Sequence, residues 1–192
     1  VLGCVIGGIT ITGLNPDSQQ GDKVILDILK RCGGKFKPVE GGLHFDRSLL
    51  KATEIDLADC PDLGPILFTL GCFCSGETVI RNAGRLRLKE SDRIEAMQTE
   101  LRKMGARIEV DGDTVHIQGV ALHAPNAPLS GHNDHRIVMA LAVAAIASGL
   151  PALLCGAEAV DKSWPAFWSV LRGLGAKVEL NTDKQEEFDI TA

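Results

Sequence analysis

Apolar residues recur at helical spacing in three segments of the chain. In the second segment they follow one another at steps of three, four and three residues, as Ile94, Met97, Leu101 and Met104. This spacing predicts a helix with one apolar stripe that faces a core. Similar patterns predict helices that begin near Gly21 and near Trp164. We therefore expect three amphipathic helices of one kind.

The residues that follow these helices also share a pattern. Gly33, Gly105 and Gly175 are each followed by a small, a basic and an apolar residue, and they are 72 and 70 residues apart. A glycine in this place is typical of a helix C-cap, and the residues after it predict a strand. A repeat of this length is a whole supersecondary unit rather than one rung of a solenoid.

A second and more apolar kind of helix is predicted in two places, from Asp62 to about Cys74 and from Asp134 to about Ser148. Both segments are apolar on almost every side, so both helices should be buried. Each ends at a glycine, Gly76 or Gly149, before a short segment that predicts a strand.

Together these elements predict an α/β (α+β) fold built from repeated strand–helix–strand–strand–helix–strand units. The chain would hold two nearly complete units and the opening of a third, over residues 1–76, 77–149 and 150–192. Glycine-containing turns near residues 41 and 112 predict hairpins. A charged stretch from Asp183 to Glu187 is expected to fray.

The composition is that of an ordinary globular protein and argues against two classes of partner. With 192 residues, 45% hydrophobic and 23% charged content, the chain can form a single domain with a good-sized core. A net charge of −5 and the absence of Tyr argue against a nucleic-acid surface. The longest apolar run, residues 137–147, is too short to span a bilayer, so no membrane partner is expected.

Both the start of the chain and its cysteines bear on where the protein works. The first residues, Val-Leu-Gly-Cys, include neither an initiator Met nor the basic start of a signal peptide, which suggests a domain cut from a longer chain. The six Cys form no C-x-x-C pair, and most lie in apolar segments. We expect reduced core thiols in a cytoplasmic protein.

The stretch Lys89-Glu90-Ser91-Asp92-Arg93 stands directly before the second amphipathic helix. Asp92 and Glu95 have the spacing of a capping box, which places the start of the helix here. Arg93 then lies in the first turn, where the helix dipole disfavours a cation. The basic residues therefore suggest an anionic ligand at this helix N-terminus. The alternative is that these charged residues form a turn that is simply solvated.

Other polar residues occur at matching places in the repeats. Gln19-Gln20 and Asp161-Lys162-Ser163 precede the other amphipathic helices, and Asn133-Asp134-His135-Arg136 opens a buried one, as Asp62 does. If the buried helices pack in parallel around a pseudo-threefold axis, all of these N-termini converge on one end of the domain. We predict that this end is an anion site.

That end would combine the positive ends of several helix dipoles with four cations: Lys89, Arg93, Arg136 and Lys162. Such a site is a good receptor for phosphate or carboxylate. Asp62 and Glu90 are the carboxylates available there for proton transfer.

Each of these interpretations has a simpler alternative. Asp62 and Asp134 could be N-caps, and Lys162 taken alone could be a solvated lysine. His132 and His135 could suggest a metal, but no third ligand has convincing spacing, so no metal is predicted. The P-loop, dinucleotide and hydrolase-elbow motifs do not occur in the sequence.

Four motifs resemble those of the 5-enolpyruvylshikimate-3-phosphate synthase family in order and spacing. The first, at residues 88–94, resembles its K-E-[ST]-D-R signature, and Asn133-Asp134-His135-Arg136-Ile137 resembles its N-D-H-R-[MI] segment. Residues 160–165 resemble its K-[ST]-[FWY]-P segment, and Pro61-Asp62 resembles the start of the helix that carries its catalytic aspartate. The resemblance covers the whole chain, but only the C-terminal half of the usual length of the family.

The resemblance implies an enolpyruvyl transferase lobe of β-α-β-α-β-β units, with parallel helices inside and sheets outside. It implies transfer of the enolpyruvyl group of phosphoenolpyruvate to the 5-hydroxyl of shikimate 3-phosphate, without a metal or organic cofactor, by a monomer. Asp62 would be the base for the hydroxyl, and Glu90 would exchange a proton with the methylene carbon. Lys89 would contact shikimate 3-phosphate, whereas phosphoenolpyruvate would be held by Arg93, Arg136 and Lys162, with His135 beside them.

Two departures from the family pattern matter. Arg85 stands where many members carry a substrate-contacting Asn, so that contact is in doubt. The N-terminal lobe, which would be a partner from the same polypeptide, is absent, and we therefore expect this fragment alone to be inactive. The alternatives are the related transferase that acts on UDP-N-acetylglucosamine and a non-catalytic anion-binding domain.

Overall fold

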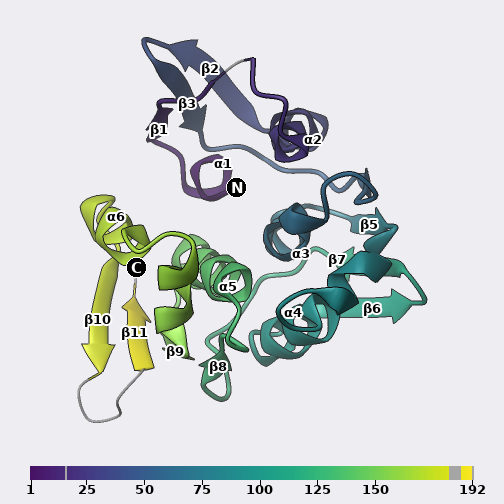
Figure 1. Ribbon diagram of the computed structural model, residues 1–192, viewed down its shortest axis with the longest axis vertical. Helices are drawn as coiled ribbons and strands as arrows, with labels where there is room; N and C mark the ends of the chain where they lie inside the picture. Colours follow the sequence, from purple (N-terminus) through teal and green to yellow (C-terminus); the bar gives the residue numbers. More distant parts are fainter. Residues whose placement is uncertain (16, 182–186, 192) are drawn as a thin grey trace.

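The computed structural model describes residues 1–15, 17–181 and 187–191 and shows an α/β fold in which three small sheets surround a set of helices (Figure 1). The first sheet has the order β1-β3-β2. Its unit contains α1 (Leu2–Ile6), β1 (Ile9–Thr12), the 3₁₀ helix η1 (Gly21–Val24), α2 (Ile25–Arg31), β2 (Lys35–Val39) and β3 (Gly42–Asp46).

The second and third sheets have four described strands each, in the orders β4-β5-β7-β6 and β10-β11-β9-β8. The second unit contains β4 (Glu54–Asp56), η2 (Pro61–Leu63), α3 (Gly64–Phe73), β5 (Glu77–Arg81), η3 (Ala83–Leu88), α4 (Arg93–Lys103), β6 (Arg107–Asp111) and β7 (Thr114–Gln118). The third contains β8 (Leu129–Ser130), α5 (His135–Ser148), β9 (Ala152–Cys155), η4 (Ala157–Lys162), α6 (Phe167–Gly173), β10 (Lys177–Asn181) and β11 (Glu187–Thr191).

Strand pairing repeats from unit to unit. β4 pairs in parallel with β5, and β8 pairs in parallel with β9, each across a buried helix. The hairpins β2–β3, β6–β7 and β10–β11 are all antiparallel. The helix before each hairpin ends at a glycine with a left-handed backbone, at Gly33 (φ 82°), Gly105 (φ 87°) and Gly175 (φ 96°), which confirms the three predicted C-caps.

The sheets divide the chain differently from the predicted units of residues 1–76, 77–149 and 150–192. Each four-stranded sheet begins with the strand before its buried helix, so the sheets draw on residues 9–46, 54–118 and 129–191. A repeated glycine gives the length of a unit but not its starting point, because the spacing between equivalent residues is the same wherever the unit is taken to begin. Of the charged stretch predicted to fray, residues 183–186 lie outside the described residues, and Glu187 begins β11.

The two buried helices lie side by side at the centre of the molecule (Figure 1). Leu67, Phe68 and Leu70 of α3 are completely buried, and α5 buries eight of its residues. The Thr69 hydroxyl of α3 donates to the carbonyl of Ala140 in α5 over 3.0 Å, and each is the sixth residue of its helix. Arg136, in the first turn of α5, also donates to Asp62, which lies just before α3. The two helices therefore run in the same direction and bring their N-termini to one end, as predicted.

Two further expectations concern membranes and thiols. Within the described part of the chain, no helix combines the length and apolar character needed to cross a bilayer. None of the six cysteines forms a disulfide with another described residue, and five of them are buried.

Candidate active site

Asp92 fixes the start of α4 and thereby the position of the basic stretch before it. Its Oδ1 accepts hydrogen bonds from the backbone N–H groups of Ile94 (3.0 Å) and Glu95 (3.1 Å), so Asp92 is the N-cap. Its Oδ2 accepts a hydrogen bond from Arg87. The predicted helix start is confirmed, and Arg93 is the first residue of the helix.

Arg93 points into the protein rather than into solvent, with only 1% of its side chain exposed. Its guanidinium donates to Asp134 from Nε (2.8 Å) and Nη2 (3.3 Å). It also donates to Asp62 (3.1 Å) and to Glu90 (2.6 Å). Burial disfavours its charge, but the hydrogen bond to Asp134 and the three carboxylates outweigh burial and raise the pKa of Arg93.

Asp134 is both a helix cap and the main counter-ion of Arg93. Its carboxylate is fully buried and accepts the backbone N–H of Arg136 (2.9 Å) and the hydroxyl of Ser91 (3.0 Å). Burial alone would raise its pKa, but the hydrogen bonds and the positive charge of Arg93 hold the pKa of Asp134 below its ordinary value. The sequence suggested the cap; it gave no sign of the buried ion pair.

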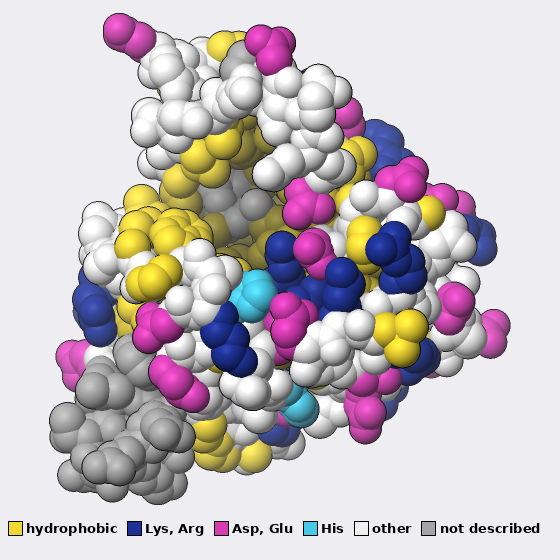
Figure 2. Space-filling view, viewed as in Figure 1, with side chains coloured by type: hydrophobic (Ala, Val, Ile, Leu, Met, Phe, Trp, Pro, Cys, Tyr) yellow, Lys and Arg dark blue, Asp and Glu magenta, His cyan; other side chains and the backbone are white. Residues whose placement is uncertain are grey.

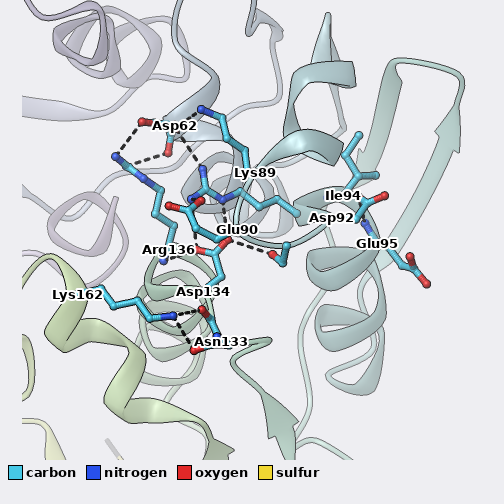
Figure 3. Close-up of polar contacts among 12 residues, drawn as sticks. Asp62, Lys89, Glu90, Asp92, Ile94, Glu95, Asn133, Asp134, Arg136 and Lys162 are labelled. Carbon is cyan, nitrogen blue, oxygen red and sulfur yellow. Dashed lines mark hydrogen bonds and ion pairs between the residues drawn. The ribbon is translucent and has the colours of Figure 1, made fainter.

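Asp62 lies where three cations meet (Figure 3). Lys89 Nζ (3.0 Å) and Arg93 Nη1 (3.1 Å) contact its Oδ1, and Arg136 Nη2 (3.1 Å) contacts its Oδ2. Lys89 and Arg136 approach the carboxylate from opposite sides. Asp62 belongs to the first turn of η2 and does not cap it, so the N-cap alternative is wrong for this residue.

Separate features of the structure account for the charge of Asp62 and for its position. Partial burial disfavours its charge, but Lys89, Arg136 and Arg93 together hold the pKa of Asp62 below its ordinary value. A glycine at position 64 brings η2 close to η3, because a Cβ there would lie 2.6 Å from Cδ1 of Leu86. This close approach places Asp62 beside Lys89.

The remaining predicted residues lie at the edges of this network. Glu90 is half exposed and pairs with Arg93. Lys162, at the end of η4, donates to the backbone carbonyl (2.5 Å) and side chain (2.6 Å) of Asn133 (Figure 3). His135 begins α5, and its buried Nδ1 has no hydrogen-bond partner among the described residues.

One predicted grouping is not found. The contacts of Gln19 and Gln20 are local, to Asp17 and Ser18, and do not join the site. His132, which is not assigned to the site, contacts Glu100.

The network presents mixed charge on one face of the molecule. Figure 2 shows basic and acidic side chains packed together at the centre of that face, beside a hollow lined by hydrophobic side chains. Lys89 and Arg136 are partly exposed, whereas Arg93 is not. An incoming anion can therefore reach Lys89 and Arg136 directly by displacing Asp62, and Arg93 only by a rearrangement of its carboxylate partners.

Comparison with known proteins identifies the family. The family model described as EPSP synthase (3-phosphoshikimate 1-carboxyvinyltransferase) matches residues 1–171. The chain belongs to the EPSP synthase family. Among its relatives, the 3-phosphoshikimate 1-carboxyvinyltransferase of Clostridium acetobutylicum is 44% identical over 176 residues, and that of Clostridium kluyveri is 40% identical over 179 residues. A solved EPSP synthase from Acinetobacter baumannii superposes with a TM-score of 0.74 at 26% identity.

These comparisons cover nearly all of this chain but less than half of its relatives. The two clostridial matches include 92% and 93% of the chain and 40% and 42% of the relatives. The Acinetobacter structure matches 90% of the chain and 43% of its own length. This EPSP synthase family chain thus spans about two fifths of the length of the proteins it matches.

Proposed function

We propose that residues 1–192 form one lobe of a two-lobe enzyme that transfers the enolpyruvyl group of phosphoenolpyruvate to the 5-hydroxyl of shikimate 3-phosphate and releases phosphate. Membership of the EPSP synthase family supports this assignment. The observation that carries it is the convergence of Lys89, Arg93 and Arg136 on Asp62. A reaction between two phosphorylated anions needs several cations to hold the substrates, and those cations must surround the carboxylate that takes part in the reaction.

The cations bind and orient the substrates. Lys89 contacts shikimate 3-phosphate, and phosphoenolpyruvate is held by Arg93, Arg136 and Lys162 beside His135. Lys89 and Arg136 are paired with Asp62. When substrate binds, its oxygens replace the Asp62 carboxylate as the partners of these two cations. This exchange removes positive charge from Asp62 and raises its affinity for a proton.

Two carboxyl groups move protons in the reaction. As the hydroxyl oxygen bonds to C2 of phosphoenolpyruvate, its proton passes to Asp62, and the methylene carbon receives a proton from the protonated carboxyl group of Glu90. Return of a proton from the new methyl group to Glu90 restores the double bond as phosphate departs from C2, and the departing phosphate takes up the proton held by Asp62. The contact between Glu90 and Arg93 (2.6 Å) places this carboxyl group at the cation cluster.

We propose further that the enzyme serves the shikimate pathway to chorismate and the aromatic amino acids, in the cytoplasm, as a monomer and without a cofactor. The absence of disulfides among the described cysteines is compatible with a reducing compartment. Residues 1–192 alone are inactive, because half of the charge around the substrates comes from the other lobe.

The decisive experiment assays the full-length polypeptide with phosphoenolpyruvate and either shikimate 3-phosphate or UDP-N-acetylglucosamine. Phosphate release is expected with shikimate 3-phosphate only, and Glu90→Gln should lower kcat by about 10²- to 10⁴-fold. Asp27→Asn, in an exposed ion pair on α2, is the matched control. Turnover with UDP-N-acetylglucosamine alone, or a fully active Glu90→Gln variant, would refute the assignment, as wild-type-like turnover by residues 1–192 would refute their inactivity.

A further inference from the structure

A second buried carboxylate lies two helical turns beyond Arg93. Glu100, on α4, is only 2% exposed. Its Oε2 accepts hydrogen bonds from the backbone N–H of Ser130 (2.8 Å) and from Lys103 Nζ (2.7 Å), and its Oε1 contacts His132 Nε2 (3.0 Å). Lys103 also donates to the carbonyl of Pro128 (2.9 Å). Glu100 and Lys103 of the second unit thus together hold residues 128–132 of the third.

The segment that Glu100 holds leads directly into the site. His132 (φ 49°) and Asn133 (φ 53°) both have left-handed backbones, which non-glycine residues adopt only at a cost. Asn133 accepts two hydrogen bonds from Lys162, and the next residue is the buried Asp134. The strained turn therefore sets the positions of two groups that define the cation cluster.

Helix α4 holds the segment before α5 at two points along the helix. Arg93 and Glu100 are seven residues apart, so they share one face of the helix. Arg93 binds Asp134, where the segment enters α5, and Glu100 binds Ser130 before the strained turn and His132 within it. With both ends fixed, the turn between them has little freedom to relax.

We propose that Glu100 is a positioning residue for the phosphoenolpyruvate part of the site, an inference that rests on the proposed function. It touches no substrate. Its hydrogen bonds to Ser130 and His132 hold the strained turn, and the turn holds Asn133 against Lys162 and places Arg136 in the first turn of α5. Lys89 belongs to the segment after η3, which Glu100 does not contact, so the shikimate 3-phosphate part of the site does not depend on Glu100.

The test compares variants of the full-length enzyme. Glu100→Ala should raise KM for phosphoenolpyruvate about tenfold and leave KM for shikimate 3-phosphate within about twofold. Glu100→Gln should restore most of the loss, because its amide oxygen can accept from Ser130 and Lys103 while its amide nitrogen donates to a neutral His132. His132→Ala, which removes one contact, should give a smaller rise. Glu109→Ala, an exposed carboxylate on β6, is the control.

A second measurement separates this inference from the reaction itself. Hydrogen exchange of the Ser130 amide, whose N–H donates to Glu100, should accelerate in Glu100→Ala and not in Glu109→Ala, whether or not the enzyme turns over shikimate 3-phosphate. Absence of turnover by the wild type would refute the proposed function. Equal rises in both KM values, unchanged exchange at Ser130, or no rescue by Gln would overturn the role of Glu100.

Discussion

The guanidinium of Arg93 and the carboxylate of Asp134 form a two-point ion pair in which both side chains are almost fully buried, with Nε 2.8 Å from Oδ2 and Nη2 3.3 Å from Oδ1. The pair joins the first residue of α4 to the N-cap of α5. A buried ion pair adds little stability compared with apolar packing, but losing one partner leaves a buried charge without compensation. The pair therefore fixes geometry between two units.

Removal of Asp134 should be strongly destabilising. Asp134→Ala leaves Arg93 buried without its main partner and removes the N-cap of α5. We expect the free energy of unfolding to fall by about 3–5 kcal/mol, measured by urea denaturation followed by circular dichroism. Asp27→Ala, which breaks an exposed pair with Lys30 (3.8 Å), should cost less than about 1 kcal/mol. Equal losses in the two variants would contradict the structural role of Asp134.

The same carboxylate should make stability depend on acid pH. Because the folded pKa of Asp134 is held below its ordinary value, the unfolded chain binds this proton first as pH falls. Its contribution is therefore complete above about pH 5 and is lost as pH drops below about 4, through the lowered folded pKa. Asp134→Asn cannot titrate here, so its free energy of unfolding should fall less steeply between pH 5 and 3. Parallel slopes in variant and wild type would rule this out.

Local sequence signals predicted both ends of α4, but not the end of α3, which stops at Phe73 rather than at Gly76. Asp92 as N-cap and Gly105 as C′ residue follow from capping chemistry within a few residues, and both are confirmed. The grouping of strands into sheets does not follow the predicted repeat units, because strand pairing such as that of β4 with β5 depends on tertiary contacts that local propensity does not encode.

The site was predictable as a set of residues but not as a network. Helix N-termini in matching repeats indicated that Asp62, Arg93 and Arg136 would converge. The pairing of Arg93 with Asp134, 41 residues away, depends on how α4 and α5 pack. Glu100 has no local signal, since a glutamate in an amphipathic helix is ordinarily solvated. Burial and long-range contacts alone distinguish it.

Two glycines at equivalent places in the repeat should differ in their tolerance of alanine. Gly105 and Gly175 both have left-handed backbones, but a Cβ on Gly105 would lie 2.6 Å from the ring of His123, whereas a Cβ on Gly175 would meet no atom of the described residues within 4 Å. Gly175→Ala should cost only the backbone term, about 1–2 kcal/mol. Gly105→Ala should cost more, because the His123 ring must also move. Thermal denaturation of both variants checks this, and equal costs would show that the ring moves freely.

Asp62 is paired with the cations that we propose bind the substrates, so its removal should separate binding from chemistry. In Asp62→Asn, Lys89 and Arg136 lose a charged partner and become available to an external anion. We expect inorganic phosphate to bind the full-length variant about tenfold more tightly, as measured by isothermal titration calorimetry. The same variant should lose about 10²- to 10⁴-fold in kcat, because the proposed acceptor of the hydroxyl proton is removed. Asp27→Asn should change neither quantity. Weaker phosphate binding in Asp62→Asn would show that Asp62 orders these cations for the anion rather than competing with it.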